Sequence, residues 1–515
     1  MDKRRSILNV TVSIISRITL LIAALFVRRL LIRYIGNDVN GLNSLYSSII
    51  GMLAVAELGV GSAIVFSMYK PIVTGEKRKI AALYGLYKRI YRIIGAVIFC
   101  AGFFVMPFLP RLINDFDAIN VNVYKTFFLA LVSVVLSYLY GAKTSLIEAH
   151  KDNYITTGFL TISRLIKYAL QVLAILIWKS FAIYLCCQIV ETLVVWTLTE
   201  IVIRRKYSDI VTIDEKVDGE TKGEISRNVK AMFMHKVGTI LVNSIDNLII
   251  SGFIGVVILG KYSNYALIAG MVMSIISLFF SPLVSVVGHL CATGDHERIQ
   301  GYYEYFYCLN YILGVVFFLG YYAVINYVVN LLFGTGLQVS RPIAFIITLN
   351  QFTQYMRRAT LLFRDASGAF YYDRWKPIAE GLSNLILSLI FVQVFPEELR
   401  IVGVIVATII TTLAICDIVD PYVVFKHVFQ KKPWKFCFKN YCYIGVFTIS
   451  LFAMSYLMIP SENNVYGILV NGFLSVGVSI FVLGLIAITD KHFRIEVQNI
   501  GRKAIAWISS RTIQS

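Results

Sequence analysis

Charged residues are scarce in this sequence. They make up 15% of the 515 residues, and the acidic kind is the scarcer, with 30 Asp and Glu against 48 Lys and Arg. So few charges cannot solvate a soluble globule of this length, and hydrophobic residues reach 57%. Apolar runs long enough for a hydrocarbon core of about 30 Å recur along the chain. The sequence therefore predicts an all-α integral membrane protein.

The motifs of many soluble enzymes and metal proteins are missing. No Walker-type phosphate loop occurs, and the eight cysteines, which mostly lie within apolar segments, lack metal-ligand spacing. The six histidines are scattered, mostly near loop ends. The longest polar stretch, about 204–227, is too short for a soluble domain. We therefore expect no enzyme activity, no bound metal and no cofactor.

The net charge of +18 is concentrated in short loops between apolar segments. Loops with several cations, such as 77–79, 204–206 and 431–435, alternate with loops that hold about one cation or are acidic, such as 396–398. This alternation is the positive-inside pattern and predicts that both termini face the cytoplasm. It favours contact with anionic lipid heads and argues against nucleic acid as a partner.

Hydropathy predicts about fourteen spans. Their approximate ranges are 7–34, 41–66, 83–109, 122–148, 153–178, 181–204, 229–254, 261–288, 300–333, 342–364, 376–395, 401–425, 438–459 and 465–489. A basic tail at 490–515 follows, and we expect it to lie on the inner membrane surface.

One sequence pattern occurs twice, 219 positions apart and in the same direction. The first copy reads IGNDVNGLNSLYSSIIGM from residue 35 to 52, and the second reads IGVVILGKYSNYALIAGM from 254 to 271. The identical pairs are Ile35/Ile254, Gly36/Gly255, Gly41/Gly260, Tyr46/Tyr265, Ile49/Ile268, Gly51/Gly270 and Met52/Met271. A match without gaps over such a length indicates a duplicated unit.

The repeat and the span count together predict the domain organisation. An offset of 219 maps the first span onto the seventh, so each copy holds six spans and the copies run parallel. We predict an N-lobe at 1–206, a cytoplasmic linker at 207–228, a C-lobe at 229–430, two further spans within 431–489 and the tail at 490–515. Two lobes related by an axis along the membrane normal are typical of transporters.

We single out four of the cations that fall inside predicted spans, where a charge costs about 2.5–3.5 kcal/mol on insertion scales. These are Arg17, Arg164, Lys167 and Lys236, and Arg17 and Lys236 occupy equivalent positions of the repeat. One interpretation is that they form buried ion pairs that fix helix packing. The other is a cationic cavity for an anionic passenger, for which the forked arginine guanidinium suits phosphate. We favour the cavity.

We also single out three carboxylates inside spans: Glu57, Glu191 and Asp246. Each is a candidate for coupling to H⁺ or Na⁺ or for pairing with one cation. Weaker candidates for the cavity are Arg28, Gln354 and Arg357. A near-interface position, with the charged group reaching the headgroups, is our expectation for Arg28, Arg364, Asp417 and Asp420.

Two blocks of the sequence resemble a known family. They are RRLLIRYIGNDVNGLNSLYSSIIGMLAVAELGVGSAI, from Arg28 to Ile64, and SIDNLIISGFIGVVILGKYSNYALI, from Ser244 to Ile268. With them the chain resembles the polysaccharide transporters (Wzx-type oligosaccharide flippases) of the multidrug/oligosaccharidyl-lipid/polysaccharide superfamily. The resemblance implies a MATE-like fold of fourteen helices, in two six-helix lobes plus two C-terminal helices.

The resemblance also implies a function. Members of the family move undecaprenyl-diphosphate-linked oligosaccharide repeat units across the bacterial cytoplasmic membrane by alternating access, for capsule, exopolysaccharide or O-antigen synthesis. Implied partners are that lipid-linked substrate, membrane lipid, a polysaccharide polymerase with other assembly proteins, and H⁺ or Na⁺ as coupling ion. Asp246 lies within the second family-like block.

Other functions stay open at this point. A MATE-type drug or cation antiporter and a flippase for the peptidoglycan precursor would use the same fold. A cationic drug favours an acidic cavity, whereas cations outnumber carboxylates among the mid-span charges singled out here. A membrane sugar polymerase, from a different class, needs a large outer loop with paired acids or arginines, and the sequence has no such loop.

Overall fold

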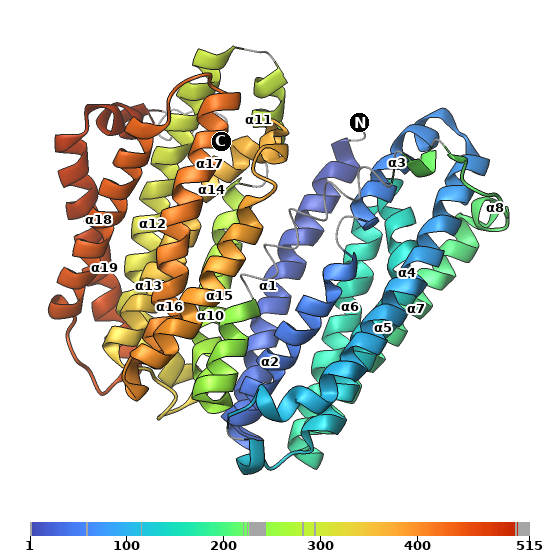
Figure 1. Ribbon diagram of the computed structural model, residues 1–515, viewed down its shortest axis with the longest axis horizontal. Coiled ribbons are helices and arrows are strands. Elements are labelled where there is room, and N and C mark those ends of the chain that lie inside the picture. The colour runs from blue at the N-terminus through green and yellow to red at the C-terminus, as the bar shows by residue number, and fades with distance from the viewer. Residues whose placement is uncertain are drawn as a thin grey trace, which may run out of the picture. The chain divides into compact units, whose positions relative to one another are not determined.

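The computed structural model describes residues 3–57, 60–114, 116–219, 221–223, 225, 244–280, 283–292, 295–499 and 502. Nearly all of these residues are helical, and no β-strand occurs among them (Figure 1). The predicted all-α class is confirmed. By contacts, the chain divides into two compact units, unit 1 at Met1–Ser263 and unit 2 at Asn264–Ser515.

Among the described residues, ten helices are long and apolar enough to cross a membrane. They are Lys77–Arg111, Val123–Ala149, Asn153–Trp178, Phe181–Lys206, Val256–Ser277, His296–Phe333, Lys376–Val394, Glu397–His427, Trp434–Leu457 and Asn464–Thr489. Nine of them coincide with predicted spans. Val256–Ser277 overlaps only part of the predicted span 261–288, because its helix ends at Phe280 and a separate helix begins at Leu283. The multi-pass membrane architecture therefore follows from the length and composition of these helices.

The other four predicted spans have different outcomes. The first, 7–34, is one continuous helix, α1 (Lys3–Tyr34), and most of the seventh, 229–254, lies outside the described residues. The second and tenth were predicted as continuous, which is wrong. A short turn at Ala54–Glu57 follows α2 (Asn37–Leu53), before α3 (Val60–Thr74), and Arg357 separates α13 (Arg341–Met356) from α14 (Arg358–Ala366).

Unit 1 is a helical bundle built around α5. Besides α1, α2 and α3 it contains α4 (Lys77–Val105), α5 (Val123–Ala149), α6 (Asn153–Leu173), α7 (Phe181–Lys206), the short α8 (Ser208–Val211) and the first residues of α10 (Val256–Phe280). Helix α5 packs against both α4 and α7, and α6 packs against α1 and α7 (Figure 1). The neighbours of α6 matter for the charged residues below.

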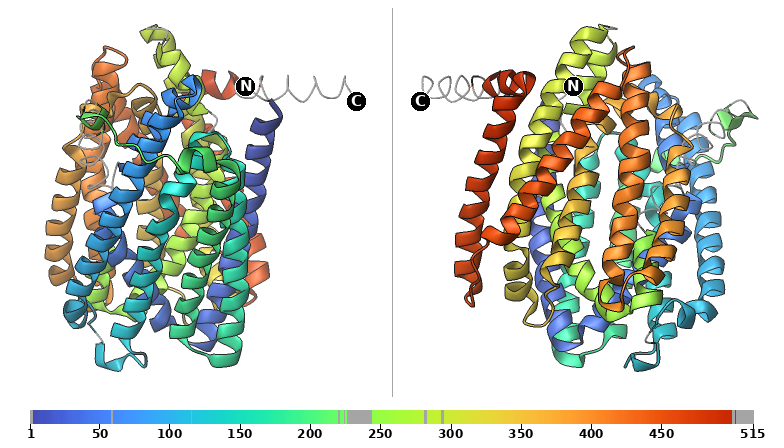
Figure 2. Two further views of the ribbon diagram at one scale, coloured as in Figure 1. Left: turned by 90° about the vertical axis from the view of Figure 1, so that its right-hand side faces the viewer. Right: turned by 60° about the vertical axis from the view of Figure 1, so that its left-hand side comes forward.

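Unit 2 is organised around the 38-residue helix α12 (His296–Phe333). The rest of α10, α13 and α14 belong to it with α11 (Leu283–Ala292), α15 (Lys376–Val394), α16 (Arg400–Thr411), α17 (Asp417–His427), α18 (Trp434–Leu457) and α19 (Asn464–Thr489). A π-helical turn at Thr412–Cys416 joins α16 to α17. Helices α18 and α19 pack against α12 (Figure 2). Residues 491–499, at the start of the predicted tail, are helical.

The duplicated glycines Gly36 and Gly255 end one helical segment and begin the next in the same way. Both have positive φ, 140° and 123°, in a region that side chains other than glycine rarely adopt. Each N–H donates to the carbonyl five residues earlier, Leu31 at 3.2 Å and Ile250 at 2.8 Å. The next helix, α2 or α10, starts at the following residue. The repeat thus preserves a helix break that needs glycine.

The second glycine pair, Gly41 and Gly260, marks a close helix crossing within unit 1. A Cβ on Gly41 would lie 1.9 Å from the carbonyl oxygen of Val256, and one on Gly260 would lie 2.4 Å from that of Asn37. Because Val256 is the repeat equivalent of Asn37, the two approaches are reciprocal. We call these four residues the glycine crossing. Backbone contact this close requires residues without a side chain.

The duplicated tyrosines Tyr46 and Tyr265 serve equivalent purposes. Tyr46 is buried, and its hydroxyl donates to the carbonyl of Val123 at 3.1 Å, at the start of α5. The Tyr265 hydroxyl, also buried, accepts the N–H of Val339 at 3.0 Å, just before α13. Each therefore fastens the start of the fourth predicted span of its own repeat. The pattern reflects packing requirements that both copies share.

Candidate functional site

Helix α6 carries two of the predicted cations, one turn apart. The Nζ of Lys167 lies 2.7 Å from Oε2 of Glu191 on α7, and Nε of Arg164 lies 3.4 Å from Oε1 of the same carboxylate. The Arg164 side chain remains 46% exposed, whereas that of Lys167 is 14% exposed. One carboxylate thus holds two cations and leaves an excess positive charge beside it.

A third cation comes from α1, the helix that packs along α6. The side chain of Arg17 is exposed, and none of the described carboxylates lies within ion-pair distance of it. We call Arg17, Arg164 and Lys167 the α1–α6 cations. Against Glu191 alone they give unit 1 a surplus of positive charge on two neighbouring helices. The fourth predicted cation, Lys236, lies outside the described residues, so its pairing with Arg17 stays a prediction.

Arg28 lies next to the glycine crossing and is held there by neutral groups. Its guanidinium donates to Oδ1 of Asn40 at 2.7 Å, to the carbonyl of Ser263 at 3.1 Å and to Oγ of Ser263 at 2.9 Å. The repeat equivalent of Arg28 is Asn247, which donates to Oγ of Ser48 at 2.8 Å. Ser48 lies four residues after Ser44, the repeat equivalent of Ser263, so the two contacts are similar in kind but not equivalent in position. Arg28 joins Asn40 to Ser263 and so clamps the crossing.

Glu57 is held by tyrosine hydroxyls at the break between α2 and α3. Tyr91 donates to its Oε1, and Tyr138 donates to Oε2 at 2.9 Å. Tyr91 in turn accepts from Tyr87 at 2.9 Å, which accepts from Ser145 at 3.1 Å. No cation among the described residues lies within ion-pair distance of Glu57. A carboxylate held only by hydroxyls is suited to take up a proton or a small cation.

Asp246, the third predicted carboxylate, lies in the helical turn before the π-helical segment Ile250–Ile254. Its side chain is buried, and Tyr262 lies close enough to interact with its charge. Its suggested partner Lys236 is outside the described residues. A role for Asp246 in coupling therefore stays a prediction.

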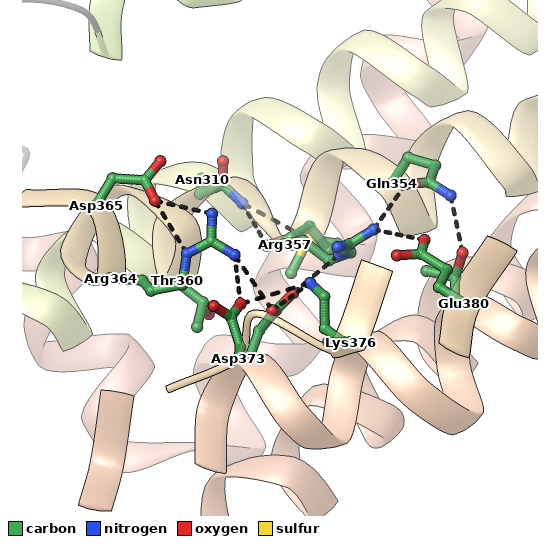
Figure 3. A network of polar contacts seen from close by, with 12 residues as sticks. Asn310, Gln354, Arg357, Thr360, Arg364, Asp365, Asp373, Lys376 and Glu380 are labelled. Atoms are coloured by element: carbon green, nitrogen blue, oxygen red, sulfur yellow. Dashed lines mark hydrogen bonds and ion pairs between the residues drawn. The ribbon is translucent and has the colours of Figure 1, made fainter. Parts of the chain in front are cut away.

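The other predicted cavity residues, Gln354 and Arg357, belong to a buried network in unit 2 (Figure 3). Arg357 lies between α13 and α14 and donates to Oε1 of Gln354 at 3.0 Å. It also contacts Oδ2 of Asp420 at 3.1 Å and Oε1 of Glu380 at 3.4 Å. Nε2 of Gln354 donates to Thr412 at 2.8 Å. All of these acceptors come from α13, α15 and the α16–α17 segment, which the network ties together.

The same network extends through two more cations. Nζ of Lys376 lies 2.5 Å from Oδ1 of Asp420, and Nη1 of Arg364 lies 2.7 Å from Oδ2 of Asp373 (Figure 3). Three buried cations thus face three buried carboxylates, and we call the set the unit 2 network. Its members are Arg357, Arg364, Lys376, Asp373, Glu380 and Asp420.

The expectation that three charged side chains reach the lipid headgroups is wrong. Arg364, Asp417 and Asp420 are 4%, 3% and 1% exposed. Arg364 and Asp420 are neutralised inside the network, so their charges have no need to reach headgroups. The spacing of the cations, seven residues between Arg357 and Arg364, was the available sign that they share a helix face.

No group of three or more His, Cys, Asp or Glu side chains in the described part of the chain is placed to hold a metal ion.

Comparison with known proteins gives matches in structure alone. No family model and no curated protein sequence matches the chain. The lipid II flippase MurJ, in an inward closed conformation, matches with a TM-score of 0.59 at 15% identity, over 97% of this chain and 100% of MurJ. A multidrug resistance MATE family transporter of the MOP superfamily, inward-facing, matches with a TM-score of 0.58 at 12% identity, over 78% of this chain and 96% of its own. A Vibrio cholerae MATE transporter reaches 0.50 at 11% identity, over 81% and 100%.

The chain has the MATE-like fold. Sequence identities of 11–15% are evidence for a shared fold only, and they do not identify the substrate of this chain. The predicted all-α, MATE-like fold class is confirmed. The α1–α6 cations lie in the first lobe, and the unit 2 network lies in the second.

Proposed function

We propose that this chain is a flippase for undecaprenyl-diphosphate-linked oligosaccharide repeat units. It moves them across the bacterial cytoplasmic membrane by alternating access of two lobes, and both termini face the cytoplasm. The observation that carries the proposal is the excess of positive charge at the α1–α6 cations, where Arg164 and Lys167 share the carboxylate of Glu191 and Arg17 has no carboxylate partner among the described residues. A surplus of exposed cations within transmembrane helices is costly unless an anion occupies the site during function.

The chemistry of this site fits a diphosphate. Arg164 is half exposed and only loosely paired at 3.4 Å, so its donors remain free to make bidentate contacts with phosphate oxygens. Lys167 is held at 2.7 Å by Glu191, which positions the ammonium while the site is empty. Arg17 supplies a further guanidinium from the neighbouring helix. Lys236, at the repeat equivalent of Arg17, is proposed to complete the set.

The last two helices support a substrate with a lipid tail. The match to MurJ leaves 3% of this chain uncovered, roughly 15 of its 515 residues, which is fewer than the 24 residues of α18 and the 26 of α19. The inward-facing MATE transporter leaves 22% uncovered. A lipid II flippase is therefore matched over nearly the full length, including most of α18 and α19. We propose that these helices hold the polyprenyl chain.

We propose Glu57 as the coupling carboxylate for H⁺ or Na⁺, ahead of Glu191. Glu191 already neutralises two cations, so taking up a proton there would release them. Glu57 is bound by two tyrosine hydroxyls and has no cation partner among the described residues. Its position at the break between α2 and α3 would let a change of charge alter how these two helices join.

A second candidate is flipping of the peptidoglycan precursor, which the match to the lipid II flippase favours. Both substrates carry a diphosphate on a polyprenyl tail, so the α1–α6 cations serve either one. The two functions differ in the cell. Restored growth of bacteria depleted of their lipid II flippase would identify the second. Restored surface polysaccharide in bacteria lacking an oligosaccharide flippase, together with its polymerase, would identify the first.

The decisive experiment for the site replaces Arg17, Arg164 and Lys236 by alanine, singly. We expect each variant to reach the membrane at the normal level and to lose export of the sugar. The matched control is Arg89→Ala, an exposed arginine on α4, which should export normally. Normal surface polysaccharide in all three variants would contradict the assignment.

A further inference from the structure

A second cationic site lies in unit 1, apart from the α1–α6 cations. A cavity of about 520 Å³ is formed by α4, α5, α7 and the short α8, and none of Arg17, Arg164 or Lys167 lines it. Helix α5 packs between α4 and α7, so its surface forms the floor and the other two helices form the walls. We call this cavity the α4–α7 groove. The proposed function does not use it.

Positive charge dominates the groove. Lys88, Arg92, Lys143 and Arg204 line it, and Glu200 is the one carboxylate among its lining residues. Glu200 is already occupied, because Nζ of Lys143 lies 2.5 Å from one of its oxygens and Nε of Arg204 lies 2.6 Å from the other.

Lys88 and Arg92 are one helical turn apart on α4, and both are exposed. None of the described carboxylates lies within ion-pair distance of either residue. Two cations in a concave site with no anion of their own form a binding site for an external anion.

The sequence around the groove predicts that it lies at the depth of lipid headgroups. After Arg92, α4 and its extension contain no charged residue from 93 to 110, and α5 contains none from 126 to 142, just before Lys143. A helical run of this length spans about 27 Å, close to the hydrocarbon thickness. Arg92 and Lys143 therefore each stand at the end of an apolar run. The loop charges predict that this end faces the cytoplasmic leaflet.

The rim of the groove is apolar and faces outward. Leu139 is 46% exposed and Trp196 is 40% exposed, and both line the cavity. The ammonium of Lys143 lies 5.0 Å from the centre of the Trp196 ring, which keeps the cation beside this apolar edge. Tryptophan is favoured where hydrocarbon meets headgroups. An anion bound here has room for an attached hydrocarbon chain along Leu139 and Trp196, which a free anion would leave unused.

The short helix α8 closes the groove at its charged end. Ser208, Val211 and Thr212 line the cavity, and Asp209 pairs with Lys77 at the start of α4. This pair holds the pKa of the Asp209 carboxyl below its usual range, because Lys77 donates to it. An occupant of the groove thus touches α4, α5 and α7 as well as the beginning of the segment that follows α7.

We propose that the α4–α7 groove binds the headgroup phosphate of an anionic phospholipid from the cytoplasmic leaflet. The phosphate contacts Lys88 and Arg92, and Lys143 and Arg204 stay beside Glu200. The acyl chains leave over Leu139 and Trp196. The bound lipid joins three helices of unit 1 to α8, so the lipid composition of the membrane influences how the segment after α7 is anchored.

The test uses the purified full chain in nanodiscs of phosphatidylcholine with a rising fraction of phosphatidylglycerol that carries brominated chains. Bromine quenches nearby tryptophan, and the part of the quenching that is lost in Trp196→Phe reports on the groove. We expect half-maximal quenching at a clearly lower lipid fraction for brominated phosphatidylglycerol than for brominated phosphatidylcholine. The double variant Lys88→Gln/Arg92→Gln removes two cations near the membrane surface. It should therefore raise the lipid fraction required for half-maximal quenching about 30-fold.

The matched control is Lys79→Gln/Arg89→Gln, which removes two exposed cations of the same helix that do not line the groove. It should behave like the parent chain. Equal quenching by the two brominated lipids, or equal shifts in both double variants, would overturn the proposal. Loss of quenching in excess inorganic phosphate would show a site for free phosphate and would also overturn it. Native mass spectrometry of the unmodified chain, which should retain one phosphatidylglycerol, decides the matter if a variant fails to fold.

Discussion

The two units treat charge inside the membrane in opposite ways. In unit 2, Arg357 and its partners are closed off, with side chains 10% exposed or less, and each cation has a carboxylate. In unit 1, Arg164 is 46% exposed and shares Glu191 with Lys167, while Arg17 has no carboxylate among the described residues. The same residue types thus form a balanced, buried set in one unit and an unbalanced, accessible set in the other.

This difference in charge balance distinguishes charged residues that hold helices together from charged residues that we propose bind the substrate. In a balanced buried network the cations and carboxylates neutralise one another and hold α13, α15 and α17 in place. Such a network needs no further anion. An accessible surplus of positive charge remains costly in a membrane until an anion arrives. Charge balance, more than the presence of charge, is therefore our reason for proposing the α1–α6 cations as the substrate site. The predictions below test that contrast.

The largest effect on folding is expected in unit 2 at Asp420. Its carboxylate contacts both Arg357 and Lys376, so Asp420→Asn leaves two buried cations with too little negative charge. Breaking a buried pair in this way typically costs about 3–5 kcal/mol. We expect little folded protein in the membrane, measured by immunoblot of membrane fractions and by thermal unfolding in detergent.

The control for this prediction is Asp365→Asn. Asp365 contacts Arg364 of the same network, but its side chain is 57% exposed, so its loss should change the melting temperature little. If Asp420→Asn were as stable as Asp365→Asn, the unit 2 network would not be holding the helices together.

A smaller loss of stability is expected at the glycine crossing of unit 1. In Gly41→Ala the new methyl group would fall 1.9 Å from the carbonyl oxygen of Val256, so the two segments have to separate. Overpacking of this kind costs about 1–3 kcal/mol. The melting temperature of the purified variant should drop, whereas Gly158→Ala on α6, where no atom lies within 4 Å, should not lower it. Equal melting temperatures would mean that the crossing tolerates a side chain.

Substitutions of the α1–α6 cations should have the opposite effect to Asp420→Asn, with little loss of stability and a large loss of transport. Arg164→Gln removes a half-exposed, loosely paired cation, for which surface ion pairs suggest a cost of about 0–1 kcal/mol. We expect nearly unchanged unfolding together with loss of sugar export in cells. A variant that loses stability and export in parallel would place Arg164 among the structural charges instead.

The smallest change in stability is expected at Glu57. Glu57→Gln keeps a side-chain oxygen that accepts from Tyr138 or Tyr91 and removes the charge that takes up an ion. Transport by the variant in vesicles should no longer respond to an imposed gradient of H⁺ or Na⁺, while the melting temperature stays close to that of the parent chain. A gradient response of normal size would exclude Glu57 as the coupling carboxylate.

Much of the fold could be predicted from the sequence because span length and loop charge are local properties. The ten apolar helices and the parallel repeat follow from such patterns. The helix breaks at Glu57 and Arg357 could not be predicted in this way, because a hydropathy average over a whole span hides a short interruption of the helix. Charge partners depend on which helices become neighbours, so Arg357 was grouped with Arg164 as a cavity residue although it lies in a buried network.

The most direct test of the account is binding and flipping of one defined substrate by purified protein in liposomes. The substrate is a fluorescent undecaprenyl-diphosphate oligosaccharide, and the paired variants are Arg17→Gln/Arg164→Gln and the control Lys79→Gln/Arg89→Gln. We predict that the parent chain and the control move the substrate between leaflets, and that the first variant, although folded, neither binds nor moves it. Equal flipping by all three proteins would contradict the claim that the unbalanced cations of unit 1 carry the diphosphate.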